Sequence, residues 1–375
     1  MSNYKSFAVT VTGGSHTKHG KGCEDASFIK EETNVNIAVV ADGHGDDNCF
    51  RSAKGSKFAV SCAANGIQEF ISNNEQNFKG KLFNRKPSVS HNEFEKSLKE
   101  TLIKYTIASW HKNIEDDYEA APFTDEELEK ADEKHRKKYE AKQDLHKAYG
   151  TTLIATAITP SYWFGIHIGD GRFTALYADG SFDQPVPWDD KCYLNVTTSI
   201  CDDDAFERTR CYLSFNNEKP PPVAVFLCTD GIDDNYPVDE NEKHLFKLYR
   251  TIAITFAEDG FESTFNQLKD LTNQFATKGK GDDTSIAGFI DMETLKKTVL
   301  IWKKQIAEEE KSAAEKTANA NTQEITETKP ENYEVNKTAT QNALEAIKAY
   351  EKQKKSVKGS ILSYGNFETK KGENK

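Results

Sequence analysis

The stretch that decides the fold is residues 151–178, TTLIATAITPSYWFGIHIGDGRFTALYA. It holds three runs typical of buried strands, at 151–159, 162–169 and 172–178. The breaks between them are Pro160-Ser161 and Gly169-Asp170-Gly171. Both are far too short for the crossover helix that a parallel connection needs. The stretch therefore predicts a meander of antiparallel strands.

Strands and helices elsewhere in the chain come in groups. Further strands are predicted at 6–12, 36–41, 223–229 and 284–290, and apolar residues at helical spacing predict helices at 59–70, 94–108, 245–256 and 265–275. A doubly wound parallel sheet would need strict alternation of the two. The pattern favours an α+β fold with antiparallel sheets.

The apolar pattern also sets the domain boundaries. We expect one domain over residues 1–292, interrupted at 113–147 by a charged helical excursion with 12 acidic and 7 basic residues. Its two interpretations are a solvated structural helix and a lid over a site. Residues 293–310 predict a helix that packs on the domain, and the polar segment 311–375 predicts a mostly disordered, flexible C-terminal tail.

Charge and cysteine content exclude several classes of protein. The net charge is −11, and residues 1–290 carry the acidic excess, which disfavours nucleic acid and anionic membrane surfaces as partners. The 7 cysteines form no CxxC pair, so a thiolate zinc site is not expected. The N-terminus resembles no signal peptide, and no apolar run is long enough to span a membrane. We expect a cytoplasmic monomer.

Acidic residues stand at the edges of five apolar runs. They are Glu24-Asp25, Asp42, Asp170, Asp230 and Asp282-Asp283. Strand ends direct side chains to one rim of a sheet, where carboxylates repel each other unless cations lie between them. Oxygen ligands suit Mg²⁺ or Mn²⁺, and Gly43 can add its carbonyl oxygen. One Asp-Gly alone is usually a turn, but five such sites together predict a metal centre.

The order of these motifs resembles the metal-dependent protein phosphatases of type 2C, and their bacterial branch in particular. The matching motifs are Glu24-Asp25, Asp42-Gly43-His44-Gly45, Gly150-Thr151-Thr152, Gly169-Asp170-Gly171-Arg172, Asp230-Gly231 and Asp282-Asp283. The resemblance covers residues 6–290. It implies a four-layer α-β-β-α sandwich of two antiparallel sheets with flanking helices. The tail lies outside it.

The resemblance also implies a set of site residues. Two Mn²⁺ or Mg²⁺ ions would be bridged by Asp42, with Asp230, Asp282 and the Gly43 carbonyl as further ligands. Asp25 and Glu24 would hold waters on the ions, and Asp170 with Asp230 would form a weaker third position. His44 is the candidate general acid, because an imidazole can titrate near neutral pH. The other interpretation of His44 is a residue that orients a ligand or water.

Two positions depart from the family pattern. The arginine that binds phosphate five residues before Asp25 is replaced by Gly20, and Lys18, Lys21 and His16 are the nearby candidates to replace it. The expected Asn is Asp283. Either member of the Asp282-Asp283 pair could be the ligand, and position favours Asp282.

The resemblance implies hydrolysis of phosphoserine and phosphothreonine in proteins by a metal-activated water. The substrate would be a phosphoprotein, linked in bacterial relatives to a serine/threonine kinase. Two alternatives stay open at this point. One is a catalytically weak phosphoprotein-binding scaffold, a pseudophosphatase, and the other is a hydrolase of small phosphate esters.

Overall fold

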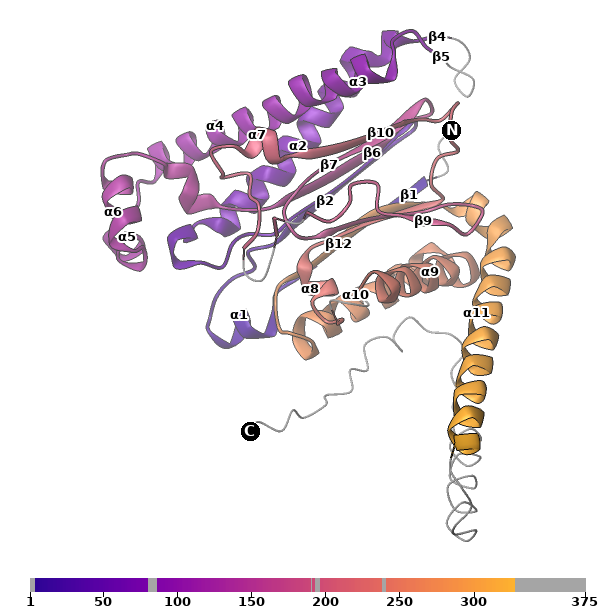
Figure 1. Cartoon of the computed structure of the whole chain (residues 1–375). Coiled ribbons are helices and arrows are strands. Elements are labelled where there is room, and N and C mark those ends of the chain that lie inside the picture. Colours follow the sequence, from indigo (N-terminus) through magenta and orange to yellow (C-terminus); the bar gives the residue numbers. More distant parts are fainter. Residues whose placement is uncertain (1–3, 80–85, 190, 193–195, 238–240, 328–375) are drawn as a thin grey trace.

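A computed structural model describes residues 4–79, 86–189, 191–192, 196–237 and 241–327. Its centre is a pair of five-stranded sheets, and helices cover the outer face of each sheet (Figure 1). All strand pairs in both sheets are antiparallel. The predicted four-layer α-β-β-α sandwich is confirmed.

The first sheet has the strand order β1-β12-β11-β8-β9. Its strands are β1 (Tyr4–Val11), β8 (Arg172–Leu176), β9 (Phe182–Asp183), β11 (Ala224–Cys228) and β12 (Thr284–Asp291). Gly288 of β12 pairs with Phe7 on one side and with Phe226 on the other. The sheet therefore joins the first strand of the domain to the last.

The second sheet has the strand order β10-β7-β6-β3-β2. Its strands are β2 (Ala26–Glu32), β3 (Val35–Ala41), β6 (Leu153–Ile158), β7 (Tyr162–Ile168) and β10 (Arg210–Phe215). Every residue of β6 and β7 is buried. Burial on both faces explains why these strands appear in the sequence as continuous apolar runs.

The predicted meander is only partly right. β6 and β7 form the expected hairpin, with Ile158 opposite Trp163. β8 does not continue it, because β8 pairs with β11 in the other sheet. The turn at 169–171 thus carries the chain between the sheets. Three extended residues reach about 10 Å, which matches the usual spacing of packed sheets.

Three apolar layers hold the sandwich together. Helices α2 (Ser52–Asn74), α3 (His91–Ser97), the π-helical turn η3 (Leu98–Ile103), α4 (Lys104–Ala120) and α7 (Ala205–Arg208) cover the second sheet. Helices α9 (Asn241–Asp259), α10 (Phe261–Lys278) and the start of α11 (Met292–Glu327) cover the first sheet. The middle layer lies between the sheets and includes Val40, Trp163 and Phe289.

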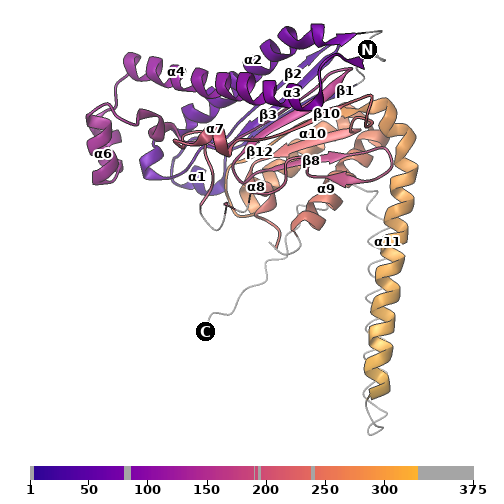
Figure 2. The same ribbon diagram turned by 45° about the horizontal axis from the view of Figure 1, so that its top comes forward.

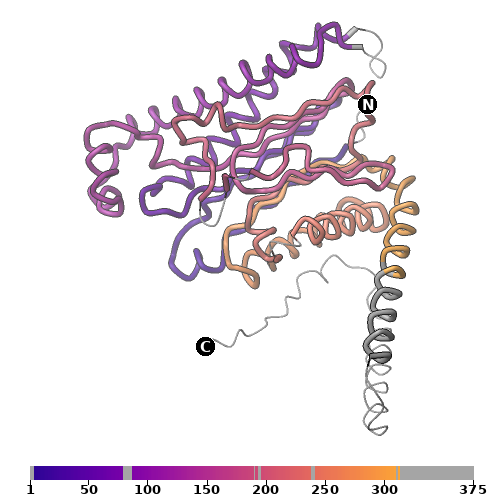
Figure 3. The backbone as a smooth tube through the Cα atoms, in the orientation of Figure 1, coloured from indigo at the N-terminus to yellow at the C-terminus, as the bar shows by residue number. Residues whose placement is uncertain are grey.

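Shorter elements complete the described chain. They are α1 (Gly14–Lys18), η1 (Asp47–Cys49), η2 (Glu75–Asn77), β4 (Phe78–Lys79), β5 (Lys86–Pro87), α5 (Asp125–Lys130), α6 (Glu133–Glu140), η4 (Leu145–Tyr149) and α8 (Asp230–Asp233). β4 and β5 form a two-stranded ribbon. The trace in Figure 3 shows how α1 and α8 lie at the same end of the sandwich.

The charged excursion packs against the domain through a buried arginine. Arg51 precedes α2 and is only 6% exposed. Its Nε and Nη2 each donate to a carboxylate oxygen of Glu127 at 2.8 Å, and its Nη1 donates to Asp117 at 3.1 Å and to Tyr149 at 2.9 Å. Phe123 meets the ring of Phe50 edge-on, 4.9 Å between centroids. The excursion thus braces the loop after β3.

Helix α11 begins on the domain and then leaves it. Leu295, Val299 and Trp302 are buried against the first sheet's helices. Arg250 of α9 holds Glu309 with two hydrogen bonds, of 3.0 and 2.6 Å. The helix continues to Glu327, past the predicted end at 310, and projects from the domain in Figure 2. Residues 328–375 of the predicted tail lie outside the described residues.

None of the described helices is long and apolar enough to cross a lipid bilayer.

Candidate metal centre

The carboxylates singled out in the sequence lie at one end of the sandwich. Asp42 directly follows β3, Asp170 lies in the turn between β7 and β8, and Asp230 begins α8 just after β11. One carboxylate oxygen from each of these three lies within 4.8 Å of the others. Segments far apart in the sequence thus form one acidic cluster.

Burial and mutual repulsion make this cluster unfavourable to ionise. Burial raises the pKa of Asp42 and of Asp230 well above the usual range, and the neighbouring carboxylates raise it further. Burial also raises the pKa of Asp170, Glu24 and Asp282, and it raises the pKa of Asp25 to about 7. Cations placed among these groups would remove the penalty, so the donor set fits a hard divalent ion.

Unsatisfied oxygens support the same interpretation. Oδ1 of Asp230 and Oε2 of Glu24 are buried and accept no hydrogen bond from the described part of the chain. The other oxygen of Glu24 accepts from Ser52 Oγ at 2.8 Å, so one oxygen is fixed while the second lies 3.7 Å from His16 Nε2. Buried acceptors without donors are costly unless a ligand satisfies them.

Two glycines let the backbone come close to the cluster. A Cβ on Gly43 would lie 2.5 Å from the carbonyl oxygen of Glu24 and 3.0 Å from that of Ser52. A Cβ on Gly231 would lie 2.1 Å from the carbonyl oxygen of Asp283. Any side chain at either position would push ligand segments apart. Glycine at these two positions is therefore required by packing.

The structure separates the roles of Asp282 and Asp283. Asp283 is 3% exposed, and its two oxygens accept from the backbone N–H of Gly13 and of Glu24, both at 2.6 Å. It therefore joins the loop after β1 to the start of β2. Asp282 accepts one hydrogen bond, from the N–H of Asp283 at 2.8 Å. This arrangement leaves Asp282 as the member of the pair better placed to bind an ion.

The three candidates for phosphate binding lie in different environments. Lys18 and Lys21 are exposed on and after α1. His16 is half-buried between two acidic residues: Nδ1 is 3.0 Å from Asp283 Oδ2, without hydrogen-bond alignment, and Nε2 is 3.7 Å from Glu24 Oε2. Among the described basic residues, only His16 forms an ion-pair contact with one of the predicted ligands.

His44 follows Asp42 by two residues, and its ring lies in a tight pocket lined by backbone and by cysteine sulfur atoms. A Cβ on Gly150 would approach His44 Cδ2 to 2.6 Å, and the Sγ atoms of Cys49 and Cys201 to 3.0 and 3.2 Å. Burial lowers the pKa of His44 to about 4, while Asp202 and Asp46 act in the opposite sense. The ring is therefore neutral at neutral pH when no substrate is present.

A sequence model of the family described as Protein phosphatase 2C matches residues 12–273, more than half of the chain. The chain belongs to the protein phosphatase 2C family. No curated protein sequence gives a significant match to it.

Several solved phosphatase structures are similar to this phosphatase 2C chain. One is the serine/threonine phosphatase PstP/Ppp of Mycobacterium tuberculosis, at 12% identity over 76% of this chain and 98% of that chain, with a TM-score of 0.43. A PstP catalytic domain in complex with two manganese ions is 13% identical over 76% of this chain and 97% of that chain, with a TM-score of 0.42. PppA, a regulatory component of T6SS in Pseudomonas aeruginosa, is 14% identical over 76% of this chain and 97% of that chain, with a TM-score of 0.44.

Some residues of this phosphatase 2C site were not predicted from the sequence. Thr229 Oγ1 donates to Asp25 Oδ2 at 2.8 Å, and Asp233 pairs with Arg172 at 2.7 Å. The Arg172 guanidinium also stacks over Trp188, 3.7 Å from the ring centroid. Thr229 and Asp233 flank Asp230 in the run CTDGIDD. That proximity was the available signal, but only the fold shows which neighbours face the cluster.

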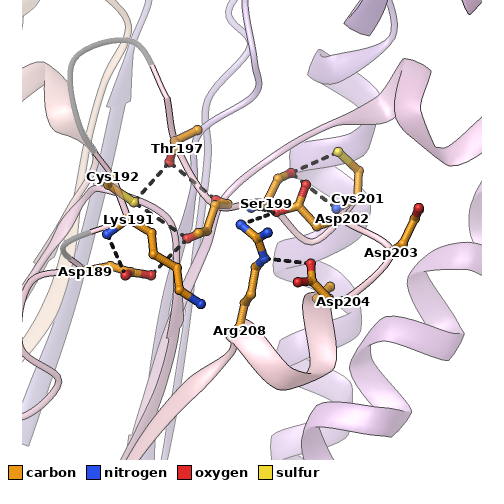
Figure 4. Close-up of polar contacts among 12 residues, drawn as sticks. Asp189, Lys191, Cys192, Thr197, Ser199, Cys201, Asp202, Asp203, Asp204 and Arg208 are labelled. Atoms are coloured by element: carbon orange, nitrogen blue, oxygen red, sulfur yellow. Dashed lines mark hydrogen bonds and ion pairs between the residues drawn. The ribbon is translucent and has the colours of Figure 1, made fainter.

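Figure 4 shows a group of polar side chains from the segment between β9 and β10 that contact one another. Ser199 N–H donates to Asp202 at 3.0 Å, and Arg208 holds Asp204 with a contact of 2.6 Å. Thr198 donates to Asp189 at 3.4 Å. The side chains of this loop thus bind one another, and Thr198 and Ser199 also bind Gly169 and Thr151.

Proposed function

We propose that this phosphatase 2C chain hydrolyses phosphoserine and phosphothreonine in proteins with Mn²⁺ or Mg²⁺ as cofactor. The single observation that supports it best is the cluster of Asp42, Asp170 and Asp230, with carboxylate oxygens within 4.8 Å of each other. Family membership supports the reaction class. A monomeric state, a cytoplasmic location and a link to a kinase stay predictions.

Asp42, the Gly43 carbonyl, Asp230 and Asp282 would hold the ions, with Asp25 and Glu24 at their margin and Asp170 at a weaker third position. When bound, such ions lower the pKa of water and offset the charge on phosphoryl oxygens. The chain's own contribution is to keep these carboxylates together at one end of two sheets despite their repulsion. The hydrogen bond from Thr229 to Asp25 and that from Ser52 to Glu24 serve this purpose.

His44 is our candidate for protonating the serine or threonine oxygen that leaves. Burial holds its pKa near 4 in the substrate-free protein. A phosphate dianion beside the ring would favour the imidazolium form, since an opposite charge nearby stabilises it. His44 would then be charged only when substrate is present to receive the proton.

His16 is our candidate for a donor to the phosphoryl oxygens. It lies between Asp283 and Glu24, with its Nε2 3.7 Å from Glu24 Oε2. Lys18 and Lys21 are exposed, so they are better suited to contact flanking parts of a phosphoprotein.

The test is Mn²⁺-dependent release of phosphate from a phosphothreonine peptide, compared with a small aryl phosphate. We expect turnover of the peptide, loss of that turnover in Asp42→Asn, and normal turnover in the control Asp270→Asn, whose carboxylate is exposed on α10. Calorimetry should show Mn²⁺ binding to the wild type. A chain that binds no Mn²⁺ and releases no phosphate would refute the proposal, and a strong preference for the aryl ester would favour small substrates instead.

A further inference from the structure

Two adjacent buried hydroxyls lie directly behind the acidic cluster. Thr198 and Ser199 are 1% and 3% exposed, in the loop between β9 and β10. Thr198 contacts the turn that carries Asp170, and Ser199 contacts Thr151, which is hydrogen-bonded to the backbone of Asp42. They are described together below as the hydroxyl pair.

Ser199 contacts the segment that supports Asp42. Its Oγ donates to the carbonyl oxygen of Thr151 at 2.9 Å and lies 3.2 Å from the Thr151 N–H, which donates to it. Thr151 in turn donates from Oγ1 to the carbonyl oxygen of Asp42 at 2.8 Å. The N–H of Thr152 donates to that same oxygen, also at 2.8 Å. One residue, Thr151, therefore separates Ser199 from the backbone of Asp42.

Thr198 contacts the turn that carries Asp170. Its Oγ1 accepts from the N–H of Gly169 at 3.0 Å. Gly169 has a φ of 117°, which side chains rarely adopt, and it directly precedes Asp170. A Cβ there would also lie 2.5 Å from Thr152 Cβ. The turn has little freedom, and the Thr198 hydroxyl fixes the peptide group next to the ligand.

We propose that the hydroxyl pair sets the spacing between Asp42 and Asp170, and so positions the part of the metal centre to which Asp170 belongs. The inference rests on the proposed function. Two buried carboxylates of like charge drift apart unless the backbone beneath them is held. Groups that hold ligands without touching the metal typically change its affinity by about 10–100-fold.

The pair adds a second connection between the two ligand segments, beside the one that Thr152 makes through its hydrogen bonds to Asp42 and its packing against Gly169. Asp42 follows a strand of the second sheet, whereas Asp170 lies in the turn that leaves it for the first. Successive residues of one loop contact the Asp170 turn directly and the Asp42 backbone through Thr151, so this loop links the supports of the two predicted ligands. Figure 4 shows Ser199 in this loop, surrounded by polar contacts of its neighbours.

The experiment compares Thr198→Val with Thr198→Ser by Mn²⁺ calorimetry on the full chain. Valine keeps the shape but removes the hydroxyl, whereas serine keeps the hydroxyl. We expect Thr198→Val to weaken one class of Mn²⁺ sites by about 10–100-fold while the remaining sites keep wild-type affinity. Thr198→Ser should bind like the wild type. Ser199→Ala is the second variant, and we expect it to weaken one class of Mn²⁺ sites as Thr198→Val does.

The matched control is Thr272→Val, a buried threonine of α10 whose hydroxyl donates to a helix carbonyl oxygen at 2.8 Å. It should lower the melting temperature in EDTA without changing any Mn²⁺ affinity. Wild-type Mn²⁺ binding in both Thr198→Val and Ser199→Ala would overturn the inference. The inference would also be overturned if these variants lost Mn²⁺ affinity equally at all sites, in proportion to their loss of melting temperature. Absence of Mn²⁺ binding by the wild type would instead refute the proposed function.

Discussion

Asp25 offers a quantitative test of the acidic cluster in the absence of metal. Its carboxyl is 3% exposed, and burial raises its pKa from 3.8 to about 7. A carboxyl with a raised pKa in the folded state holds its proton more tightly than in the unfolded chain. Its contribution to stability is therefore complete at low pH and is lost as the pH rises from the unfolded to the folded pKa.

The magnitude follows from the size of the shift. Roughly three pKa units at about 1.4 kcal/mol each give a cost on the order of 4 kcal/mol above neutral pH. Asp25→Asn removes the charge but keeps an oxygen for the hydrogen bond from Thr229 Oγ1. We expect the metal-free variant to exceed the wild type in stability by up to about 4 kcal/mol near pH 8, and by little near pH 4.

Urea unfolding in EDTA across this pH range measures the effect, with Asp270→Asn as a control at an exposed site. The wild type should lose stability as the pH rises, and saturating Mn²⁺ should restore it. The reasoning would be refuted if Asp25→Asn and the wild type had parallel stability curves from about pH 5 to about pH 8. Parallel curves would mean that ionisation of Asp25 does not lower the free energy of unfolding.

Four further predictions follow from individual contacts. His44→Ala should slow turnover of an alkyl phosphopeptide far more than that of an aryl phosphate, because an aryl leaving group needs little protonation. Asp283→Asn should lower the melting temperature, because an amide NH₂ would face one of two backbone N–H donors. Arg51→Met should cost about 3–5 kcal/mol in urea unfolding, whereas Lys54→Met, which removes an exposed partner of the same Asp117, should cost about 1 kcal/mol or less. A chain shortened after residue 310 should keep its melting temperature and turnover, because the side chains of α11 described as buried, Leu295, Val299 and Trp302, all precede that point.

Each of these has a contrary result. Equal slowing of both substrate classes would assign His44 to orientation of water or ligands. An unchanged melting temperature in Asp283→Asn would mean that the loop between β1 and β2 needs no carboxylate. Equal losses of unfolding free energy in Arg51→Met and Lys54→Met would show that the buried arginine contributes no more to stability than the exposed lysine. A large loss of turnover on shortening would make the C-terminal segment part of the enzyme.

The sequence by itself determined the features that depend on neighbouring residues. An apolar run that ends in Asp-Gly identifies a buried strand and a carboxylate at its end, so Asp42, Asp170 and Asp230 could be named as candidate ligands without a structure. The hairpin of β6 and β7 follows from a short turn between two apolar runs. The start of α11 follows from Leu295, Val299 and Trp302 at helical spacing.

Only the tertiary structure decided the features that depend on residues far apart in the chain. A three-residue turn suits a hairpin and a crossing between stacked sheets equally well, so β8 was assigned to the wrong partner. Asp282 and Asp283 are alike in sequence, and they differ because Gly13 and Glu24 approach Asp283 alone. The hydroxyl pair has no motif, because its partners Thr151 and Gly169 reach it only when the sandwich has formed. Consecutive residues determine which chemical groups stand at the end of a strand, whereas packing between distant segments sets the spacing between the candidate ligands.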